Sequence, residues 1–394
     1  MLRSFEIERF RTFAHLQIKQ LGRVNLVVGR NNVGKSMLLE ALRLYGSLNP
    51  VSVLANLLRK CDEFSVGRVL RRGLSGQGFP EVSSLFHGRQ PLVGEAHAIT
   101  LRSDTSDPSA LTLWLVASAT HMHGSPPIQV ETEQEEALHR SDAHVELLKV
   151  RQATGLYSVR AHALTLISGE ETAPGVLVAE NPPIVPPNEV DRRAVARQWD
   201  AVKLLGREDH VKEWVGIVTP IETILDVGDP KDSQTRVFLV RLPGSQPVPL
   251  KSLGDGMVRI FHIALALESA RSLGARQPEA AEYPASAESA GEGAGVPPRP
   301  MDMLLIDEVE NGIHYTVLRK VWRFVFEVAR RTDVQVFATT HSWDCVEAFQ
   351  AAAAEDPEAD AMLIRLERKG EEHRAVTFSQ EDLAIVTRDR IEVR

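Results

Sequence analysis

The pattern of apolar and polar positions predicts three strands and a helix within the first 45 residues. Residues 2–9 alternate between polar and apolar side chains, and extended runs cover Leu16–Gln20 and Val24–Val28. Alternation with a period of two is typical of strands. The run VNLVV is almost entirely apolar, as expected for a strand that is buried on both faces. Apolar residues from Leu38 to Tyr45 then recur with helical spacing.

The middle of the chain changes from strand patterns to helix patterns. Between about 98 and 178, strand character recurs in AITLRS, LTLWLVAS, IQVETE, HVELLKV, LYSVRAH and LTLIS. The proline cluster PPIVPP at 182–187 closes this region, because proline cannot continue a central strand. Helical patterns then cover Val190–Leu205, 209–217 and Gly256–Ser272, and an extended run covers 236–250.

Residues 274–300 differ in composition from the rest of the chain. Of these 27 positions, 22 are Ala, Pro, Gly, Glu or Ser, and only Tyr283 and Val296 are large and apolar. Such a segment cannot bury enough apolar surface to offset its ordering entropy, so a flexible surface loop is expected.

The last hundred residues alternate between strand and helix patterns. The order is strand 303–306, helix 314–331, strand 334–339, helix 343–354 and strand 361–367. This order is typical of βαβ units, so an α/β fold with a mainly parallel sheet is expected.

Composition and charge narrow the class of protein. The chain has 45 basic and 53 acidic side chains, a net charge of −8, which argues against general coating of nucleic acid but leaves a local basic patch open. Two cysteines exclude a disulfide framework and fit a reducing compartment. No apolar run reaches the ~18 residues of a membrane span, and the start MLRSFEIERF is charged where a signal peptide is apolar. A cytoplasmic protein without a membrane segment is expected.

The segment GRNNVGKS at 29–36 fits the phosphate-binding pattern G-x-x-x-x-G-K-[ST]. Glycines let successive backbone N–H groups turn inward around a phosphate, and the helix that follows points its positive end at the same anion. Lys35 would reach the β- and γ-phosphates, and the Ser36 hydroxyl would coordinate Mg²⁺. A chance glycine-rich turn is the alternative, but this motif follows a predicted strand and opens a predicted helix. The expected nucleotide contacts are Gly29, Asn31, Asn32, Val33, Gly34, Lys35, Ser36 and Met37.

In two later segments, chemically active side chains come directly after a predicted buried strand. LLIDE at 304–308 delivers Asp307 and Glu308 to the carboxyl edge of the sheet, where ligands bind in open α/β folds. Asp307 would hold Mg²⁺ with Ser36, and Glu308 would polarise the attacking water. Because successive strand residues point to opposite sides, the two carboxylates should have different roles. An acidic pair after a strand can also be purely structural.

VFATTHS at 336–342 places His341 at the same edge, where a histidine can hydrogen-bond a γ-phosphate or the attacking water. Ser342 can in addition act as the N-cap of the helix that follows. The expected catalytic set is therefore Lys35, Glu308 and His341.

Together these motifs resemble the ABC-type ATPase heads of the OLD, RecF and SMC proteins. The resemblance covers Met1–Tyr45 and about 208–342, roughly half of the chain. The opening strand, ERFRTF and second strand before the P-loop look like the start of OLD- and RecF-like heads. SLGDGMVRIF at 252–261 looks like the signature segment, and IDEVENGIH at 306–314 resembles the extended Walker B motif. Where the family has Leu-His-Pro, this chain has Ile313-His314-Tyr315, which leaves the role of His314 open.

The resemblance implies an ATP-bound homodimer in which the signature of one subunit closes over the ATP of the other. The signature residues would be Ser252, Gly254, Asp255 and Gly256. The usual Ser-Gly-Gly is replaced by Ser-Leu-Gly-Asp-Gly. Either Ser252 or only the glycine backbone would then contact the phosphate. The alternative is that this segment is an ordinary helix that begins at a glycine. No glutamine stands out as the Q-loop residue, and SLFHGR at 84–89 is the place to look.

The resemblance also implies the fold and its division. The expected fold is an ABC-ATPase-like P-loop fold with a mixed, mainly parallel core sheet, an antiparallel β subdomain and a helical signature lobe. The expected parts are an N-terminal P-loop lobe with a β-rich insertion (1–180), a helical signature lobe (181–273), the flexible loop (274–300) and a Walker B and switch-histidine lobe (301–394).

Two features separate this chain from its better-known relatives. OLD proteins usually carry a TOPRIM nuclease with an Asp-x-Asp motif, and the 53 residues after His341 contain no such motif. SMC heads carry long heptads after the P-loop, whereas this interval is strand-rich and broken by prolines. The expected protein is therefore a stand-alone ATPase head that regulates a separately encoded effector, a TOPRIM-like nuclease, in phage defence or DNA maintenance. The alternative is a RecF-like, nucleotide-gated DNA-binding or scaffold protein with slow hydrolysis.

Two weaker patterns leave alternatives open. Five basic residues, offset by Asp62 and Glu63, could contact a nucleic-acid backbone or form a solvated face; they are Arg59, Lys60, Arg68, Arg71 and Arg72. His121-Met122-His123 could hold a metal, but no third ligand is evident.

Overall fold

The computed structural model describes residues 1–47, 49–60, 80–89, 93–104, 107, 109–121, 128–132, 143–152, 155–160, 182–188, 190–229, 232–274 and 302–389. Several expectations lie outside these residues: Arg68, Arg71, Arg72, Met122, His123, the strand LTLIS and the loop beyond Gly274.

The core is a six-stranded, mainly parallel sheet in the order β16-β15-β3-β14-β13-β9. Its strands are β3 (Val24–Val28), β9 (Ile184–Val185), β13 (Met303–Ile306), β14 (Gln335–Thr339), β15 (Ala361–Lys369) and β16 (Glu372–Phe378). All neighbours pair in parallel except β15 and β16, which are antiparallel. The mixed, mainly parallel α/β fold predicted from the sequence is thus confirmed. Strand β9 lies between prolines at an edge of the sheet, where a missing N–H is tolerated.

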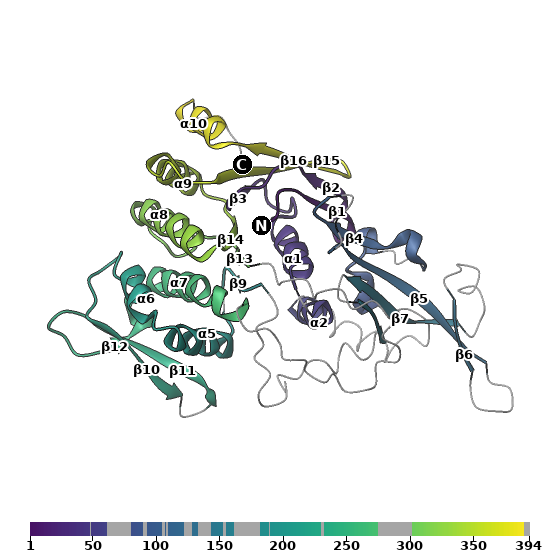
Figure 1. The fold of residues 1–394 in the computed structure, drawn as a ribbon, viewed down its shortest axis with the longest axis horizontal. Helices are drawn as coiled ribbons and strands as arrows, with labels where there is room; N and C mark the ends of the chain where they lie inside the picture. Colours follow the sequence, from purple (N-terminus) through teal and green to yellow (C-terminus); the bar gives the residue numbers. More distant parts are fainter. Residues whose placement is uncertain are drawn as a thin grey trace.

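The central strands are buried on both faces because helices α7, α8 and α9 cover one side and helix α1 with a second sheet covers the other (Figure 1). Leu304 and Ile306 of β13 belong to a core with α7, α8 and α9, whereas Met303 and Leu305 pack with α1 and the N-terminal strands. This division follows the period of two along a strand. The helices are α1 (Lys35–Tyr45), α7 (Asp255–Gly274), α8 (Tyr315–Thr332), α9 (Trp343–Glu355) and α10 (Gln380–Arg388).

The second sheet is antiparallel and follows the order β2-β1-β4-β5-β7-β8, with β6 paired to β5. Its strands are β1 (Phe5–Phe10), β2 (Phe13–Ile18), β4 (Ile99–Arg102), β5 (Leu111–His121), β6 (Ile128–Thr132), β7 (Ala143–Gln152) and β8 (Gly155–Arg160). Short helices accompany it: α2 (Pro50–Lys60), α4 (Pro80–Ser83), η1 (His87–Arg89) and η2 (Glu95–His97). The N-terminal hairpin therefore belongs to this sheet and contributes no strand to the parallel core.

A smaller lobe surrounds the start of α7. It contains α5 (Arg192–Leu204), α6 (Glu208–Val215), η5 (Leu250–Leu253) and the antiparallel strands β10 (Thr223–Asp229), β11 (Asp232–Arg241) and β12 (Val248–Pro249). Trp199 of α5 packs against Phe238 and Phe261, with ring centroids 5.6 and 6.0 Å apart. Helix α7 therefore links this lobe to the parallel core, because its residues also belong to the core that contains β13.

No helix among the described residues is long and apolar enough to cross a membrane.

Candidate functional site

The P-loop joins β3 to α1 in a conformation that requires its glycines. Gly29 has φ 148° and Gly34 has φ 100°, both in a region that side chains disfavour. A Cβ on Gly29 would lie 2.6 Å from the carbonyl oxygen of Leu366, and one on Gly34 would lie 2.6 Å from Phe13 Cζ. The first N–H groups of α1 donate to no N-cap side chain, because the N-cap is Gly34, so they are available to an anion.

The remaining predicted loop contacts differ in exposure. Asn31, Asn32 and Ser36 are exposed, whereas Val33 is buried. Asn32 has φ 61°, a conformation in which asparagine is better tolerated than most residues.

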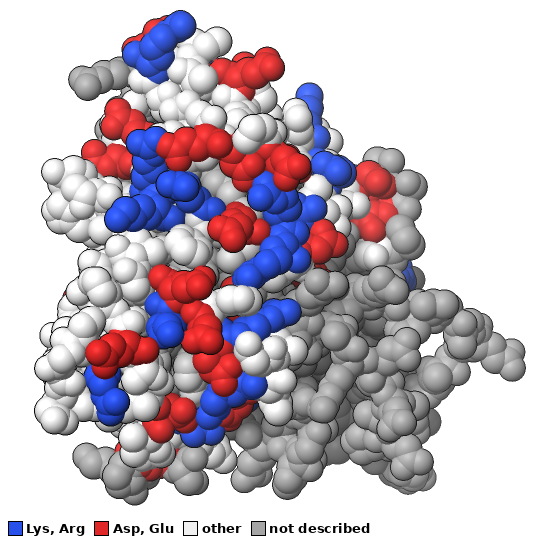
Figure 2. Space-filling view, turned by 60° about the vertical axis from the view of Figure 1, so that its left-hand side comes forward, with Lys and Arg blue, Asp and Glu red and all other residues white. Residues whose placement is uncertain are grey.

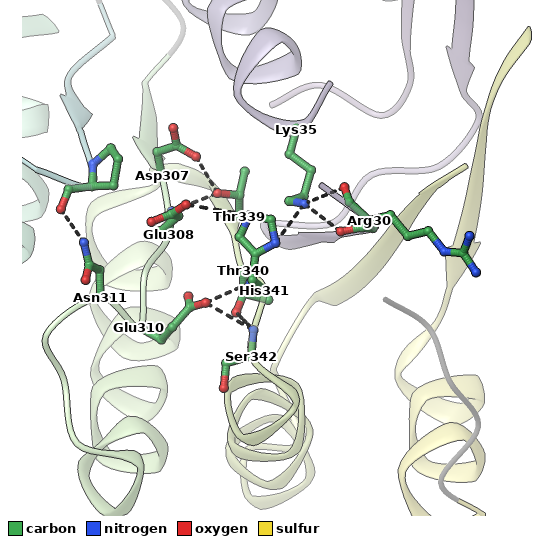
Figure 3. Close-up of polar contacts among 12 residues, drawn as sticks. Arg30, Lys35, Asp307, Glu308, Glu310, Asn311, Thr339, Thr340, His341 and Ser342 are labelled. Carbon is green, nitrogen blue, oxygen red and sulfur yellow. Dashed lines mark hydrogen bonds and ion pairs between the residues drawn. The ribbon is translucent and has the colours of Figure 1, made fainter. Parts of the chain in front are cut away.

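Lys35 is buried at the start of α1 and folds back over the P-loop (Figure 3). Its ammonium donates to the carbonyl oxygens of Gly29 (2.6 Å) and Arg30 (3.1 Å), and lies 3.3 Å from His341 Nδ1. Burial lowers the pKa of Lys35, and the carboxylates of Asp307, Glu308 and Glu310 oppose this shift. Because an ammonium only donates, Nδ1 of His341 accepts, and the neutral imidazole carries its proton on Nε2.

The acidic turn, residues 307–312, follows β13 directly. Asp307 is buried, and its Oδ1 accepts a hydrogen bond from Thr339 Oγ1 at 2.6 Å. The same hydroxyl oxygen accepts from the backbone N–H of Glu308 at 2.8 Å. Thr339, the last residue of β14, therefore fastens the turn to the neighbouring strand.

The two carboxylates differ for a reason other than strand alternation. The strand ends at Ile306, so neither Asp307 nor Glu308 is a strand residue. Glu308 instead adopts left-handed backbone angles, with φ 51°. Its side chain is 39% exposed, as is that of His341, and its Oε1 lies 3.6 Å from His341 Nε2. The two carboxylates face different surroundings because of the turn, and the strand alternation expected for them is wrong. That they have different roles stays a prediction.

Glu310 was not identified in the sequence, although it belongs to the same turn. Its Oε1 accepts from the backbone N–H groups of His341 (2.8 Å) and Ser342 (3.1 Å), as Figure 3 shows. Ser342 in turn caps α9, because its side chain accepts from the N–H of Cys345. The available signal was a third acid only two positions after Glu308, in IDEVEN. Glu310 thus fixes the backbone that carries His341.

Arg259 of α7 was also missed. Its guanidinium is buried and donates to the carbonyl oxygens of Pro186, Asp307 and Glu308, the last at 3.0 Å. Burial lowers the pKa of Arg259 to about 10, and the carboxylates of the acidic turn oppose this shift. A basic residue within an apolar helix pattern was the signal that could have drawn attention to it.

The signature segment lies where η5 passes into α7. Ser252, Gly254 and Asp255 are exposed, and Gly254 has φ 98° with open space around the position of a Cβ. A Cβ on Gly256 would lie 2.5 Å from the carbonyl oxygen of Gly312. The signature segment is therefore in close contact with the far end of the acidic turn.

The structure shows the contacts of His314 and of the segment SLFHGR, whose roles the sequence left open. The ring of His314 caps α8, where Nδ1 lies 2.9 Å from Thr316 Oγ1 and the side chain accepts from the N–H of Thr316. In SLFHGR, Phe86 forms a bridge to Phe10, and His87 Nδ1 lies 3.2 Å from the carbonyl oxygen of Arg11. The suggestion that this segment replaces the Q-loop stays a prediction.

Charges of both signs are mixed on the face drawn in Figure 2. Ion pairs such as Arg330–Asp356 (2.8 Å) and Arg236–Asp226 (2.8 Å) join basic to acidic side chains in the described part of the chain. The described residues of that face therefore form no extended basic surface of the kind that follows a nucleic-acid backbone.

Comparison with known proteins adds a family match. Residues 175–344 match the family described as "AAA domain, putative AbiEii toxin, Type IV TA system". This range contains the signature segment, the acidic turn and His341, whereas the P-loop lies before it.

Two curated proteins are similar in sequence. A Helicobacter pylori protein named "ATP/GTP phosphatase" is 20% identical over 359 residues, which make up 88% of this chain and 87% of that protein. "Uncharacterized protein MJECL10" of Methanocaldococcus jannaschii is 36% identical over 61 residues, which make up 15% of this chain and 28% of that protein.

Solved structures with overall similarity are SMC heads. The SmcHead bound to the C-winged helix domain of ScpA has a TM-score of 0.47 at 12% identity, covering 96% of this chain and 98% of that chain. The SMC head domain from Thermotoga maritima has a TM-score of 0.39 at 13% identity, covering 96% and 99%.

The class of protein follows from the site and the family match together. A P-loop, an acidic turn after strand β13 and a histidine just after the neighbouring strand β14 meet at one edge of the core sheet (Figure 3). Together with the match of residues 175–344 to an AAA domain, this geometry supports an ATPase of the P-loop class.

Proposed function

We propose that this protein hydrolyses Mg²⁺–ATP at the P-loop, dimerises on ATP and thereby regulates a separately encoded effector. The observation that carries the hydrolytic part is the meeting of Lys35, Glu308 and His341 through contacts of 3.3 and 3.6 Å. These three side chains come from three separate segments, so the fold concentrates them at one place.

The residues present fit a magnesium ion. Asp307 offers the carboxylate oxygen that Thr339 does not bind, and the Ser36 hydroxyl is exposed at the start of α1. Mg²⁺ prefers such oxygen ligands and usually shares them with substrate phosphates. When bound, it would neutralise charge that develops on the phosphate oxygens.

Each side chain then has a distinct task. The Lys35 ammonium exchanges the carbonyl oxygens of Gly29 and Arg30 for the β- and γ-phosphates. Glu308 accepts a proton from, or orients, the attacking water. His341 directs its Nε2–H at the γ-phosphate or the water, since Nδ1 faces Lys35. The loop residues Gly29, Asn31, Asn32, Val33, Gly34 and Met37 complete the nucleotide contacts.

The dimer is proposed from the signature segment. Its exposed Ser252, Gly254 and Asp255 stand at the start of a 20-residue helix, whose N-terminus favours an anion. In the proposed ATP sandwich this segment contacts the γ-phosphate held by the second copy. The division into lobes 1–180, 181–273 and 301–394, with a flexible 274–300 loop, remains part of this proposal.

The effector is proposed from the resemblance to OLD-like heads encoded beside TOPRIM-like nucleases. The matching family's description also names a toxin and a TA system, which agrees with an ATPase that acts together with a second protein. The setting we propose is phage defence or DNA maintenance, in the cytoplasm.

Four measurements on the purified chain test this proposal. The chain should hydrolyse ATP only with Mg²⁺, and light scattering with a non-hydrolysable analogue should show a dimer. An untagged neighbour-encoded protein should copurify with it, and DNA binding should depend on that neighbour. Salt-dependent DNA binding by the chain alone would instead support the RecF-like alternative. A monomer at saturating nucleotide and micromolar protein would contradict the ATP sandwich.

A further inference from the structure

The backbone of Glu308 has a conformation that must be held in place. Left-handed angles are unfavourable for a residue other than glycine, and such residues persist where their surroundings over-determine them. At φ 51° Glu308 is in this region, and its side chain is the one that faces His341. Whatever holds the peptide groups on either side of Glu308 therefore sets where its carboxylate points.

Both sides of Glu308 are held, by two different elements. On the amino side, the N–H of Glu308 donates to Thr339 Oγ1 at 2.8 Å. Arg259 Nη2 also donates to the carbonyl oxygen of this same peptide group, that of Asp307. On the carbonyl side, Arg259 Nη2 donates to the oxygen of Glu308 at 3.0 Å. Thr339 belongs to the core sheet, whereas Arg259 belongs to the signature helix α7.

Burying the guanidinium of Arg259 costs more free energy than is needed to attach a helix to the core. It is 5% exposed, its hydrogen bonds go to three carbonyl oxygens, and its Nε has no hydrogen-bond partner. Burying a guanidinium without a carboxylate bonded to it carries a large desolvation cost. Helix α7 already packs into the core through Ile260, Phe261 and Ala264. Anchoring the helix does not require the cation.

We propose that Arg259 is a positioning residue for ATP hydrolysis, which holds Glu308 in its left-handed conformation and couples the acidic turn to the signature segment. Arg259 lies one helical turn after Asp255, so a shift of the start of α7 displaces its guanidinium. The close contact of Gly256 with Gly312 attaches the other end of the turn to the same helix. The coupling rests on the proposed function. A signature segment that contacts the ATP of the second copy would then adjust the acidic turn that acts on the ATP of its own subunit.

A double-mutant cycle tests this proposal. Arg259→Gln should lower kcat by about 10- to 100-fold, the scale of misplacing a reacting group by about 1 Å, and leave the Kd for ATP within about 2-fold. Arg259→Lys keeps the charge but has one nitrogen for three carbonyl oxygens, so its loss should be smaller. In a Glu308→Gln background, where single-turnover assays measure the residual rate, Arg259→Gln should cause no further loss, since Arg259 acts through Glu308.

Arg207 supplies the matched control. Its Nη1 donates to the carbonyl oxygen of Glu268, which lies on helix α7 more than two turns beyond Arg259. Arg207→Gln should lower the melting temperature and leave kcat unchanged. If Arg259→Gln does not fold, the same cycle is run with Arg259→Lys.

The outcomes separate the two proposals. An equal loss of kcat in the wild-type and Glu308→Gln backgrounds, an unchanged kcat, or a matching loss in Arg207→Gln would overturn the role of Arg259. Normal turnover by Glu308→Gln itself would instead overturn the role of Glu308 in the proposed function. A loss that Glu308→Gln masks, with ATP affinity retained, supports Arg259 as the positioning residue.

Discussion

The P-loop and the acidic turn both have a part in the proposed ATP hydrolysis, but they are built in different ways. The P-loop is one continuous segment whose shape comes from its own glycines and the start of its own helix. The acidic turn has a left-handed glutamate where glycine would be favoured, and it keeps its shape through Thr339 of β14 and Arg259 of α7. The first is specified locally and the second by tertiary contacts.

This difference has a functional meaning. A locally specified loop binds phosphate whatever the neighbouring lobe does, because its N–H groups are fixed by the sequence of the loop. A turn held from two elements responds when either element moves. Nucleotide binding and nucleotide cleavage should therefore be separable by mutation, and within one subunit only cleavage should depend on the signature helix.

The largest loss of ATP affinity and turnover is expected from a substitution in the P-loop. Lys35→Ala removes the cation that reaches the β- and γ-phosphates, so ATP affinity should fall sharply and turnover should drop by at least about 10³-fold. The melting temperature without nucleotide should change little, because the ammonium bonds only local carbonyl oxygens and His341. Calorimetric titration and a phosphate-release assay measure both quantities. Near-normal turnover would remove the P-loop assignment.

The next effect separates the two carboxylates of the acidic turn. Glu308→Gln should retain ATP binding and lower the hydrolysis rate by about 10²–10⁴-fold, typical of losing a general base. Asp307→Asn should instead weaken Mg²⁺–ATP binding, because it changes a metal ligand that is also bonded to Thr339. The closed dimer should accumulate only in the Glu308 variant, as measured by light scattering. Trapping in the Asp307 variant would show that the roles are assigned to the wrong residues.

The same contrast explains what the sequence could and could not predict. Strand β13 was predicted with its observed bounds, and the P-loop helix was predicted from spacing alone, because periodicity and glycine chemistry are local. Strands β10 and β16 and helix α10 were missed. β10 and β16 are only partly buried, so their apolar signal is weak.

Within the site, the missed residues are those that act on backbone groups far away in sequence. Arg259 bonds carbonyl oxygens 48 and 49 positions later, and Glu310 bonds N–H groups 31 and 32 positions later. No spacing motif encodes such a contact, since its geometry exists only after α7, β13 and β14 have packed. Both residues were nevertheless visible as charges beside apolar runs.

Glu310 gives a third, smaller effect that tests the tertiary control of the site. Glu310→Ala removes the acceptor of the His341 N–H and leaves the Ser342 N–H bonded only to Thr340 Oγ1, so the histidine loses its fixed position. Turnover should fall about 10-fold, within the range for losing correct orientation of a catalytic group. Glu310→Gln keeps an oxygen acceptor and should lose less. Equal losses in the two variants would assign the effect to the charge of Glu310 and not to its hydrogen bonds.

The smallest effect on turnover should come from the contact between the signature helix and the acidic turn. In Gly256→Ala the new Cβ would lie 2.5 Å from the Gly312 carbonyl oxygen, so one backbone must shift. The shift should lower the free energy of unfolding by about 1–2 kcal/mol, since overpacking costs somewhat more than the helix propensity of alanine returns. Turnover should fall only a few-fold, because Thr339 of the core sheet still holds the N–H of Glu308. Gly228→Ala, where nothing lies within 4 Å of the Cβ position, is the matched control and should alter neither quantity. If Gly256→Ala lowered ATP affinity while sparing turnover, the helix would be coupled to the P-loop and not to the acidic turn, and the contrast drawn between the two regions would be wrong.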